Sequence, residues 1–180
     1  MTRVDSDDSW RRIEGLRLEL LECRSATAAL EAFCARDRVS PPCAIKARLL
    51  EAGSRPATRD QRRRLGARAD ETIAYRKVHL VHGGIVLCEA SNWYLPARLT
   101  HAMNERLAET DIPFGRAVAD LEPFRQTIAS QSFWEPGHPA PPVLFDHRAL
   151  LLTESGQAFA EVEEHYGAGL LSFVRQPPAS

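Results

Sequence analysis

The feature that most constrains this chain is an alternating stretch at residues 75–81, which a pair of glycines separates from a second extended run at residues 85–96. Two such runs joined by a short glycine turn are typical of a β-hairpin. The alternation places Arg76 on the same face as Val78 and Leu80. Because an arginine keeps its proton, burial in this apolar row requires an anionic partner, either another side chain or a ligand carboxylate.

The composition is that of an ordinary globular domain. The 180 residues are 44% hydrophobic and 26% charged, which argues against disorder and predicts one domain with one core. With a formal net charge of −1, the protein as a whole is not attracted electrostatically to nucleic acid or anionic lipid. The four cysteines form no C-x-x-C pair, and the chain has neither an apolar signal segment nor a membrane-spanning run. We therefore expect reduced thiols in a cytoplasmic protein without a membrane span.

Periodicity and capping residues predict a mixture of helices and strands. The expected helices cover residues 10–22, 25 to a stop at Pro41-Pro42, 58–65 and 99–107, and the expected strands cover residues 44–50, a hairpin at 73–96, 124–132, 143–153 and 158–166. We expect one domain over residues 9–172 between flexible tails at 1–8 and 173–180. Strands that arrive as successive hairpins predict an antiparallel sheet, and the fold class is therefore α+β.

The motifs disfavour metal and nucleic-acid sites. His79 and His82 lie three residues apart on a predicted strand and so face opposite ways, and no zinc, Walker or dinucleotide-binding motif is present. The arginines at residues 59–68 come without interleaved aromatic residues, which favours a solvated helix face over phosphate contact. We expect no metal and no nucleic-acid partner.

Three glutamates mark the last predicted strand. Glu161 and Glu163 face one way with Phe159, whereas Glu164 faces the other way with Val162. A carboxylate shielded beside Phe159 would hold its proton more tightly and could act as an acid or base. Charges that protect an exposed edge strand from aggregation are the more common arrangement. Periodicity leaves open which face of this strand is the inner one.

Several segments together resemble the chorismate pyruvate-lyase family, whose members split chorismate into 4-hydroxybenzoate and pyruvate. The similar segments are the arginine strand at 75–80 with its hairpin to Leu95-Pro96, the Ile-Pro-Phe-Gly-Arg turn at 112–116, the Ser-Gly-Gln turn at 155–157 with the strand through Glu163, and the segment 30–34. The resemblance covers about residues 30–166. It implies a highly twisted antiparallel sheet of about six strands with helices on one side and a buried ligand cavity, the chorismate lyase-like fold.

The resemblance also implies roles for particular residues. Arg76 would bind the ring carboxylate of chorismate, and Glu163 would meet the oxygen at the ring's 4-position as the acid, base or hydrogen-bonding group. The other expected contacts with substrate are Phe114 and Cys34 against the ring and either Arg116 or Arg98 on the second carboxylate.

The first functional prediction is therefore a cofactor-free carbon–oxygen lyase of the kind that supplies 4-hydroxybenzoate for ubiquinone biosynthesis. The same fold also forms the effector-binding part of GntR-type transcription factors, so the fold alone does not establish catalysis. The alternative is a non-catalytic binding or sensor domain for an aromatic carboxylic acid, which would keep Arg76 but need no acid/base glutamate. A third possibility is a structural domain in which Arg76 pairs with Glu163. In the first two cases the expected partner is a small aromatic or cyclic carboxylate.

Overall fold

The computed structural model describes residues 3–36, 44–53, 55–109 and 111–174, which form six strands and five α-helices. The strands are β1 (Lys46–Gly53), β2 (Ala74–His82), β3 (Ile85–Tyr94), β4 (Phe124–Ser132), β5 (Val143–Leu152) and β6 (Ala158–Gly167). The helices are α1 (Arg3–Glu22), α2 (Ala26–Ala35), α3 (Arg59–Arg64), α4 (His101–Glu109) and α5 (Phe114–Ala117), with 3-10 helices η1 (Pro96–Arg98), η2 (Ala119–Leu121) and η3 (Ala168–Phe173).

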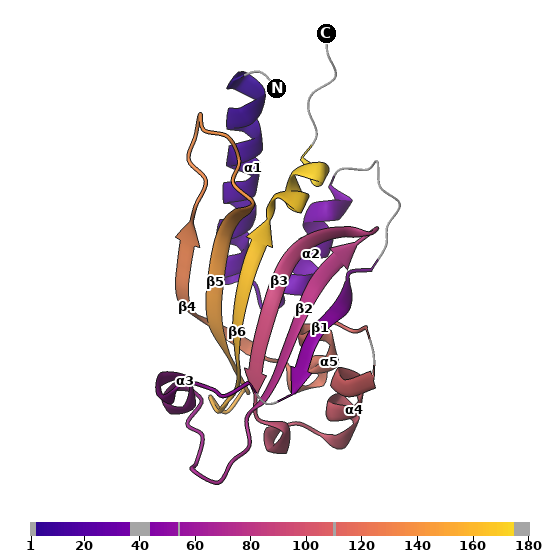
Figure 1. The fold of residues 1–180 in the computed structure, drawn as a ribbon, viewed down its shortest axis with the longest axis vertical. Helices are drawn as coiled ribbons and strands as arrows, with labels where there is room; N and C mark the ends of the chain where they lie inside the picture. Colours follow the sequence, from indigo (N-terminus) through magenta and orange to yellow (C-terminus); the bar gives the residue numbers. More distant parts are fainter. Residues whose placement is uncertain (1–2, 37–43, 54, 110, 175–180) are drawn as a thin grey trace.

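All six strands belong to one open sheet in the order β1-β2-β3-β6-β5-β4, and each neighbouring pair is antiparallel. The sheet is twisted, and α1 and α2 lie behind it in the view of Figure 1. We call the side that packs against α1 and α2 the helix face and the other side the outer face. The predicted α+β architecture with a six-stranded antiparallel sheet is confirmed.

The hairpin between β2 and β3 turns at the two glycines that the sequence singles out. Gly83 and Gly84 have φ angles of 55° and 87°, a left-handed conformation that residues with a Cβ rarely adopt. The flanking residues His82 and Ile85 face each other directly across the hairpin. The turn and a one-residue register shift between Leu80 and Val81 together place Arg76 opposite Asn92.

Most of the core lies between the helix face and the helices. Its largest cluster combines α1, α2 and η3 with side chains of the sheet, among them Leu16, Leu20, Leu30, Phe33, Val78, Leu80, Phe145, Tyr166 and Leu170. A second cluster joins α4 and α5 to β5 and β6 through residues such as Leu107, Phe114, Ala149 and Val162. This packing buries most of the helix face, whereas Leu49 on the edge strand β1 stays exposed.

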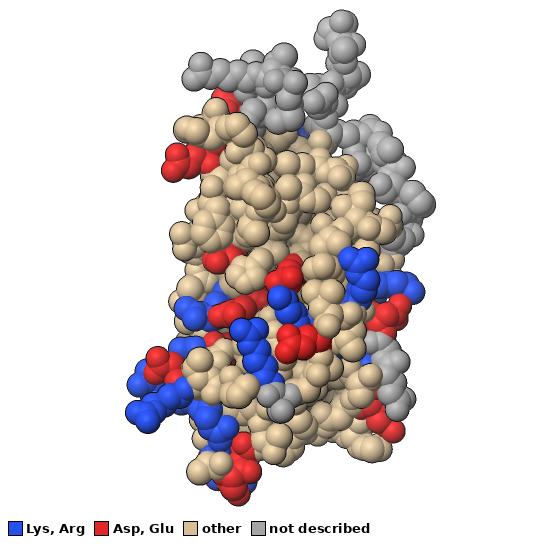
Figure 2. Space-filling view, in the orientation of Figure 1, with Lys and Arg blue, Asp and Glu red and all other residues tan. Residues whose placement is uncertain are grey.

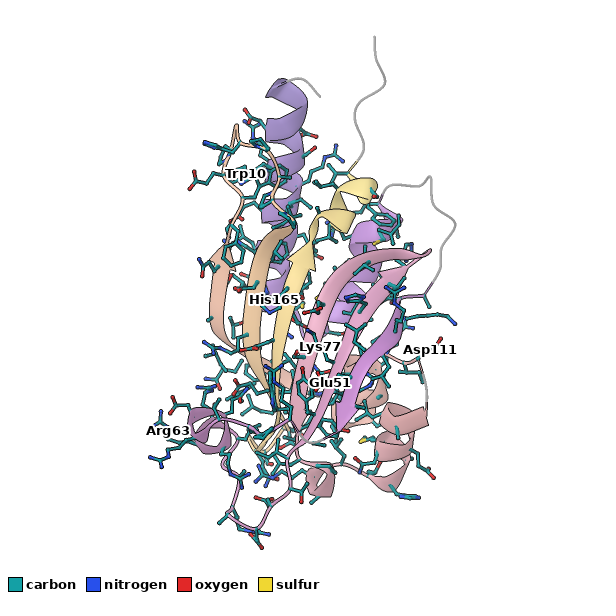
Figure 3. The ribbon with its side chains drawn as sticks, in the orientation of Figure 1. Trp10, Glu51, Arg63, Lys77, Asp111 and His165 are labelled. Carbon is teal, nitrogen blue, oxygen red and sulfur yellow. The ribbon has the colours of Figure 1, made fainter. Side chains whose placement is uncertain are left out.

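One helix departs from the expected one-sided arrangement. Leu65, at the end of α3, packs with Tyr75 and Trp93 in a small cluster on the outer face, and Figure 1 shows α3 beside the lower end of the sheet. The rest of that face carries charged pairs such as Lys77 with Glu89, 2.8 Å apart. Figure 2 shows these charges gathered in its middle and lower part, and Figure 3 shows Lys77 there.

The ends of the domain differ from the prediction. Helix α1 begins at Arg3 instead of residue 10, because the acidic residues of this segment favour a helix amino end and Asp8 pairs with Arg12 one turn later. Residues 173 and 174 belong to the core. The predicted stop at Pro41-Pro42, Cys43 and most of the predicted tails lie outside the described residues. Among the described residues, no helix is long and apolar enough to cross a membrane.

Candidate functional site

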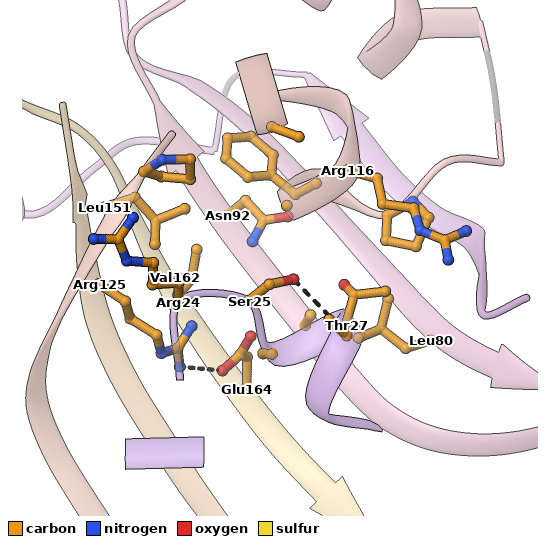
Figure 4. Close-up of a pocket in the computed structure, with 18 of the residues that line it drawn as sticks. Arg24, Ser25, Thr27, Leu80, Asn92, Arg116, Arg125, Leu151, Val162 and Glu164 are labelled. Carbon is orange, nitrogen blue, oxygen red and sulfur yellow. Dashed lines mark hydrogen bonds and ion pairs between the residues drawn. The ribbon is translucent and has the colours of Figure 1, made fainter. Parts of the chain in front are cut away.

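A cavity of about 480 Å³ opens between α2, α5 and the helix face of the sheet. Figure 4 shows its lining, which comes from β2 to β6 and from the segments around both helices. The apolar lining residues include Val78, Leu80, Ala90, Phe114, Leu151 and Val162, and the charged ones are Arg24, Glu31, Arg116, Glu122, Arg125 and Glu164. The cavity therefore combines an apolar floor with three arginines and three glutamates.

The amino end of α2 forms one wall. Ser25 caps this helix with an extended backbone, and its Oγ accepts a hydrogen bond from the Ala28 amide at 3.2 Å. Residues 24–28 all line the cavity. The amides of the first turn have no partner within the helix, and the helix dipole makes this end favourable for negative charge.

Helix α5 forms the opposite wall. Its first residue, Phe114, is buried, and its ring lies 5.3 Å from the ring of Tyr94. Arg116 of the same helix donates to both carboxylate oxygens of Glu31 at 2.5 and 2.6 Å. This ion pair joins α5 to α2 at the cavity through Nη2 of Arg116.

A buried ion pair closes one side of the cavity. Arg125 Nη2 donates to Glu164 Oε2 at 2.5 Å, and the hydroxyl of Tyr166 donates to the same oxygen at 3.0 Å. Burial alone would lower the pKa of Arg125, but the adjacent carboxylate outweighs burial and raises it. Burial and the same carboxylate raise the pKa of Tyr166. Arg125 therefore stays charged and Tyr166 stays protonated at neutral pH.

Asn92 lies on the floor of the cavity. It stands on β3 between Arg76 of β2 and Val162 of β6, which are its partners across the sheet. Its exposed fraction is 3%, and its Oδ1 has no hydrogen-bond partner among the residues that the structure describes. A buried amide oxygen without a donor is unfavourable, and Oδ1 is covered, so it does not itself face the cavity.

Arg76 is buried on the helix face, as the alternation predicts, with an exposed fraction of 2%. Its Nη2 donates to the backbone carbonyl of Ile112 at 3.3 Å. Burial lowers the pKa of Arg76, although a guanidinium keeps its proton at any physiological pH. Within the described part of the chain, Arg76 is beside the cavity residue Asn92 but does not itself line the cavity.

The structure does not bring Glu163 to Arg76. Glu163 stands opposite Ser91 of β3, and Ser91 stands opposite Lys77, so all three belong to the outer face. The carboxylate of Glu163 is partly exposed and lies 3.7 Å from Arg148. A direct pair between Arg76 and Glu163 is therefore wrong, and the glutamate that reaches the cavity from β6 is the next one, Glu164.

The other predicted contacts divide between the cavity and the structural core. Phe114 and Arg116 line the cavity. Cys34 of α2 is buried in the core cluster between that helix and the sheet and is not among the residues described as lining the cavity. Arg98 donates to the backbone carbonyls of Leu65 and Ala158 at 2.7 and 2.5 Å, which makes it a structural cross-link.

The polar residues of the cavity that were not predicted include Arg24, Asn92, Arg125 and Glu164. The sequence carried a signal for two of them. Glu164 alternates with Val162, and Asn92 interrupts an apolar row with Ala90. No comparable signal marks Arg24, which precedes a helix cap, or Arg125. No cluster of three potential metal ligands occurs in the described residues.

The comparisons with solved structures show the fold. The effector domain of PhnF from Mycobacterium smegmatis has a TM-score of 0.56 and 11% identity, over 80% of this chain and 88% of that domain. A ligand-binding domain assigned to the GntR family of regulators, from Bordetella bronchiseptica, has a TM-score of 0.51 and 15% identity, over 69% of this chain and 83% of that one. These likenesses confirm the fold shared by GntR effector domains, whereas the chorismate pyruvate-lyase resemblance stays a prediction.

Two further comparisons concern longer proteins. YydK of Bacillus subtilis, described as a possible transcriptional regulator, has a TM-score of 0.55 and 19% identity over 75% of this chain, which spans only 64% of YydK. No family model matches the sequence. The uncharacterized protein y4mC of Sinorhizobium fredii (strain NBRC 101917 / NGR234) is 36% identical over 179 residues, which cover 89% of this chain and 76% of y4mC. This chain therefore belongs to the same family as y4mC.

Proposed function

We propose that this protein is a non-catalytic binding domain for a small aromatic or cyclic carboxylic acid, which it holds in the cavity between α2, α5 and the helix face. The observation that carries the proposal is the cavity itself. Its volume of about 480 Å³ lies in the range of small-molecule sites, and such sites combine an apolar lining with a few polar groups.

The lining suits a flat, acidic molecule. Phe114, Leu80 and Val162 offer apolar surface to a ring, and removing ring surface from water favours binding. Arg24 and Arg116 stand on different sides of the cavity in Figure 4, and Arg116 is already paired with Glu31. Arg24 is exposed and forms no ion pair with any described residue, so its guanidinium is available to a carboxylate.

The carboxylates of the site favour binding over catalysis. Glu31 and Glu164 are each paired with an arginine at 2.5 Å, and Glu163 lies on the outer face. The remaining lining carboxylate, Glu122, is exposed to solvent. An acid or base needs a carboxylate that can exchange a proton beside the substrate. The solved structures add support, since the domain of PhnF is described as an effector domain and the Bordetella domain as ligand-binding.

Thermal unfolding with two acids tests the proposal. We expect chorismate and 4-hydroxybenzoate to raise the melting temperature by about 5 °C or more at concentrations about 100-fold above Kd. Ala28→Trp, which places a large ring at the cavity, should remove this shift. Ala32→Trp lies one turn further along α2, outside the cavity lining, and is the matched control.

A second measurement separates binding from turnover. Protein incubated with chorismate should release no pyruvate above the uncatalysed rate. Equal formation of pyruvate and 4-hydroxybenzoate, lost in Arg76→Ala, would contradict the proposal and favour a lyase. Failure of both acids to stabilise the wild type would contradict binding of this class of ligand.

A further inference from the structure

The two edge strands of the sheet differ in how they are protected from pairing with another chain. Strand β1 carries the charged side chains of Lys46, Arg48 and Glu51. The amide of Ala47 donates to the backbone carbonyl of Asp111 at 2.6 Å, which covers the start of this edge. Charges and a covered backbone are common means of keeping an edge strand from pairing further. The β1 edge is therefore a protected one.

Strand β4, at the other edge, lacks these features. Residues 126–134 contain no charged side chain, and among the described residues β4 has no hydrogen-bonded neighbour on the side away from β5. Figure 1 shows β4 as the outermost strand on its side of the sheet. Phe124 begins the strand and Phe133 directly follows it, and they are 56% and 43% exposed. An uncharged edge between two exposed aromatic rings is suited to pairing with another strand.

The order of residues along β4 matches its own reverse. We consider two copies of the strand that run antiparallel, with Phe124 of one copy opposite Phe133 of the other. The facing pairs are then Phe124 with Phe133, Arg125 with Ser132, Gln126 with Gln131 and Thr127 with Ser130. Aromatic pairs and threonine–serine pairs stabilise neighbouring antiparallel strands, and this alignment places no like charges opposite each other.

The same alignment keeps the two faces of the sheet in phase. Gln126 and Gln131 are an odd number of positions apart, so simple alternation would place them on opposite faces. The pairing of β4 with β5 shifts by one residue at Ile128, and both glutamines lie on the outer face, opposite Leu150 and Asp146. The shift lies midway between the two glutamines. A two-fold axis of the pairing therefore passes through it, and both copies bend alike.

We propose that β4 pairs antiparallel with β4 of a second copy of this chain, so that the two sheets join into one across a two-fold axis at the middle of the strand. The partner is a second copy because the facing residues match only when both strands carry this sequence. A two-fold interface of this kind uses the same surface on both subunits. The inference concerns assembly and does not depend on the ligand of the cavity.

The mass in solution tests the proposal. Light scattering after gel filtration and sedimentation equilibrium at micromolar concentrations should give the mass of two chains. Gln126→Lys with Gln131→Lys should raise the dissociation constant of the dimer by about tenfold or more, because like charges then face each other at two places. The matched control, Gln126→Glu with Gln131→Lys, places opposite charges there and should stay within about threefold of the wild type. Both glutamines are exposed, and circular dichroism checks that the variants are folded.

A pair of cysteines tests the register. Gln126→Cys with Gln131→Cys places thiols opposite each other between the two copies, whereas within one strand the two positions are too far apart to join. Oxidation should therefore link two chains. Gln126→Cys with Ser132→Cys is the control, because Ser132 stands opposite Phe145 on the helix face and its replacement would point away from position 126. The wild type, oxidised in parallel, accounts for the four cysteines of the chain.

The outcomes are separate from those for the proposed function. A wild type that stays monomeric over this range of concentrations would overturn the proposal. An unchanged dissociation constant in the double-lysine variant would also overturn it, because the copies would then meet at another surface, and so would equal linking of the two cysteine variants. None of these measurements uses a ligand. Their failure therefore leaves the binding function standing, and failure of the acids to bind leaves this inference standing.

Discussion

Arg125 of β4 and Glu164 of β6 form a buried ion pair that reaches across β5, with 2.5 Å between Nη2 and Oε2. Their side chains are 3% and 8% exposed. The pair closes one side of the cavity and connects two strands that are not neighbours in the sheet. A buried pair of this kind depends on both members, because either charge alone would be left in an apolar setting.

Removing one member of this pair should lower the free energy of unfolding more than removing both members. We expect Glu164→Leu to lower the free energy of unfolding by about 3–5 kcal/mol, and Arg125→Leu together with Glu164→Leu to recover most of that loss. Urea unfolding at neutral pH measures both. Asp111→Asn breaks an exposed pair with Lys46 and should cost less than about 1 kcal/mol. If the loss of unfolding free energy in the double variant equalled the sum of the losses in the two single variants, this account would be contradicted.

Stability should fall in mild acid because of His147. This ring is 2% exposed, neither nitrogen has a hydrogen-bond partner among described residues, and burial lowers its pKa to about 4. The surrounding charges are Glu164 and Arg125 of the sheet and Arg17 and Glu14 of α1.

Between pH 6.5 and pH 4 the unfolded chain binds a proton at His147 that the native state does not bind. The buried His147 therefore leaves the free energy of unfolding unchanged above pH 6.5 and lowers it increasingly as the pH falls. The loss reaches about 2 kcal/mol near pH 4 once solvent screening is allowed for. Unfolding free energies of wild type and His147→Leu, compared across this range, measure it. Parallel curves for the two proteins would rule it out.

Gly169 should not tolerate a side chain. A Cβ at this position of η3 would lie 2.0 Å from the carbonyl oxygen of Val86 and 3.1 Å from the Cγ2 of Ile85. Gly169→Ala must therefore push η3 away from β3, and we expect a loss of about 1–3 kcal/mol in chemical denaturation. Gly15→Ala is the control, since a Cβ there meets nothing within 4 Å and alanine favours helix α1 by up to about 1 kcal/mol.

Arg98→Lys should weaken the fold without changing ligand binding. The guanidinium of Arg98 donates to the carbonyls of Leu65 and Ala158 and also pairs with Glu71 at 2.9 Å. A lysine cannot make these contacts together, because it has a single ammonium group instead of a planar fork. We expect a loss of about 1–3 kcal/mol in unfolding free energy, with unchanged affinity for a hydroxybenzoate that binds the wild type. A lower affinity in a variant that remains folded would instead indicate contact with ligand.

Local patterns were sufficient for most of the strands. The alternation over β2 places Arg76 with Val78, and the two glycines that follow make the turn. The predicted boundaries of β4, β5 and β6 match the observed strands to within two residues. These features depend on neighbours along the chain and on the period of two of a strand, both of which are visible in the sequence.

The inner face of β6 was decided only by the tertiary structure. Both of its faces are partly buried, since Glu161 is covered on the outer face and pairs with Arg64 of α3, whereas Glu164 is covered on the helix face. Periodicity separates the two sets of residues but carries no information on which set a helix will cover. Residues 163 and 164 are adjacent in sequence and lie on opposite faces. Which of the two glutamates reaches the cavity therefore depends on which face the helices cover.

The cavity likewise required the assembled chain. Arg24, Asn92 and Arg125 come from a helix cap, a central strand and an edge strand, and no spacing in the sequence relates them. The sequence by itself determined most of the strands, their arrival as antiparallel hairpins and the buried arginine, because short-range geometry controls those features. Only the packing of α2 and α5 on the sheet decided which polar groups face a ligand, because that depends on contacts between distant segments.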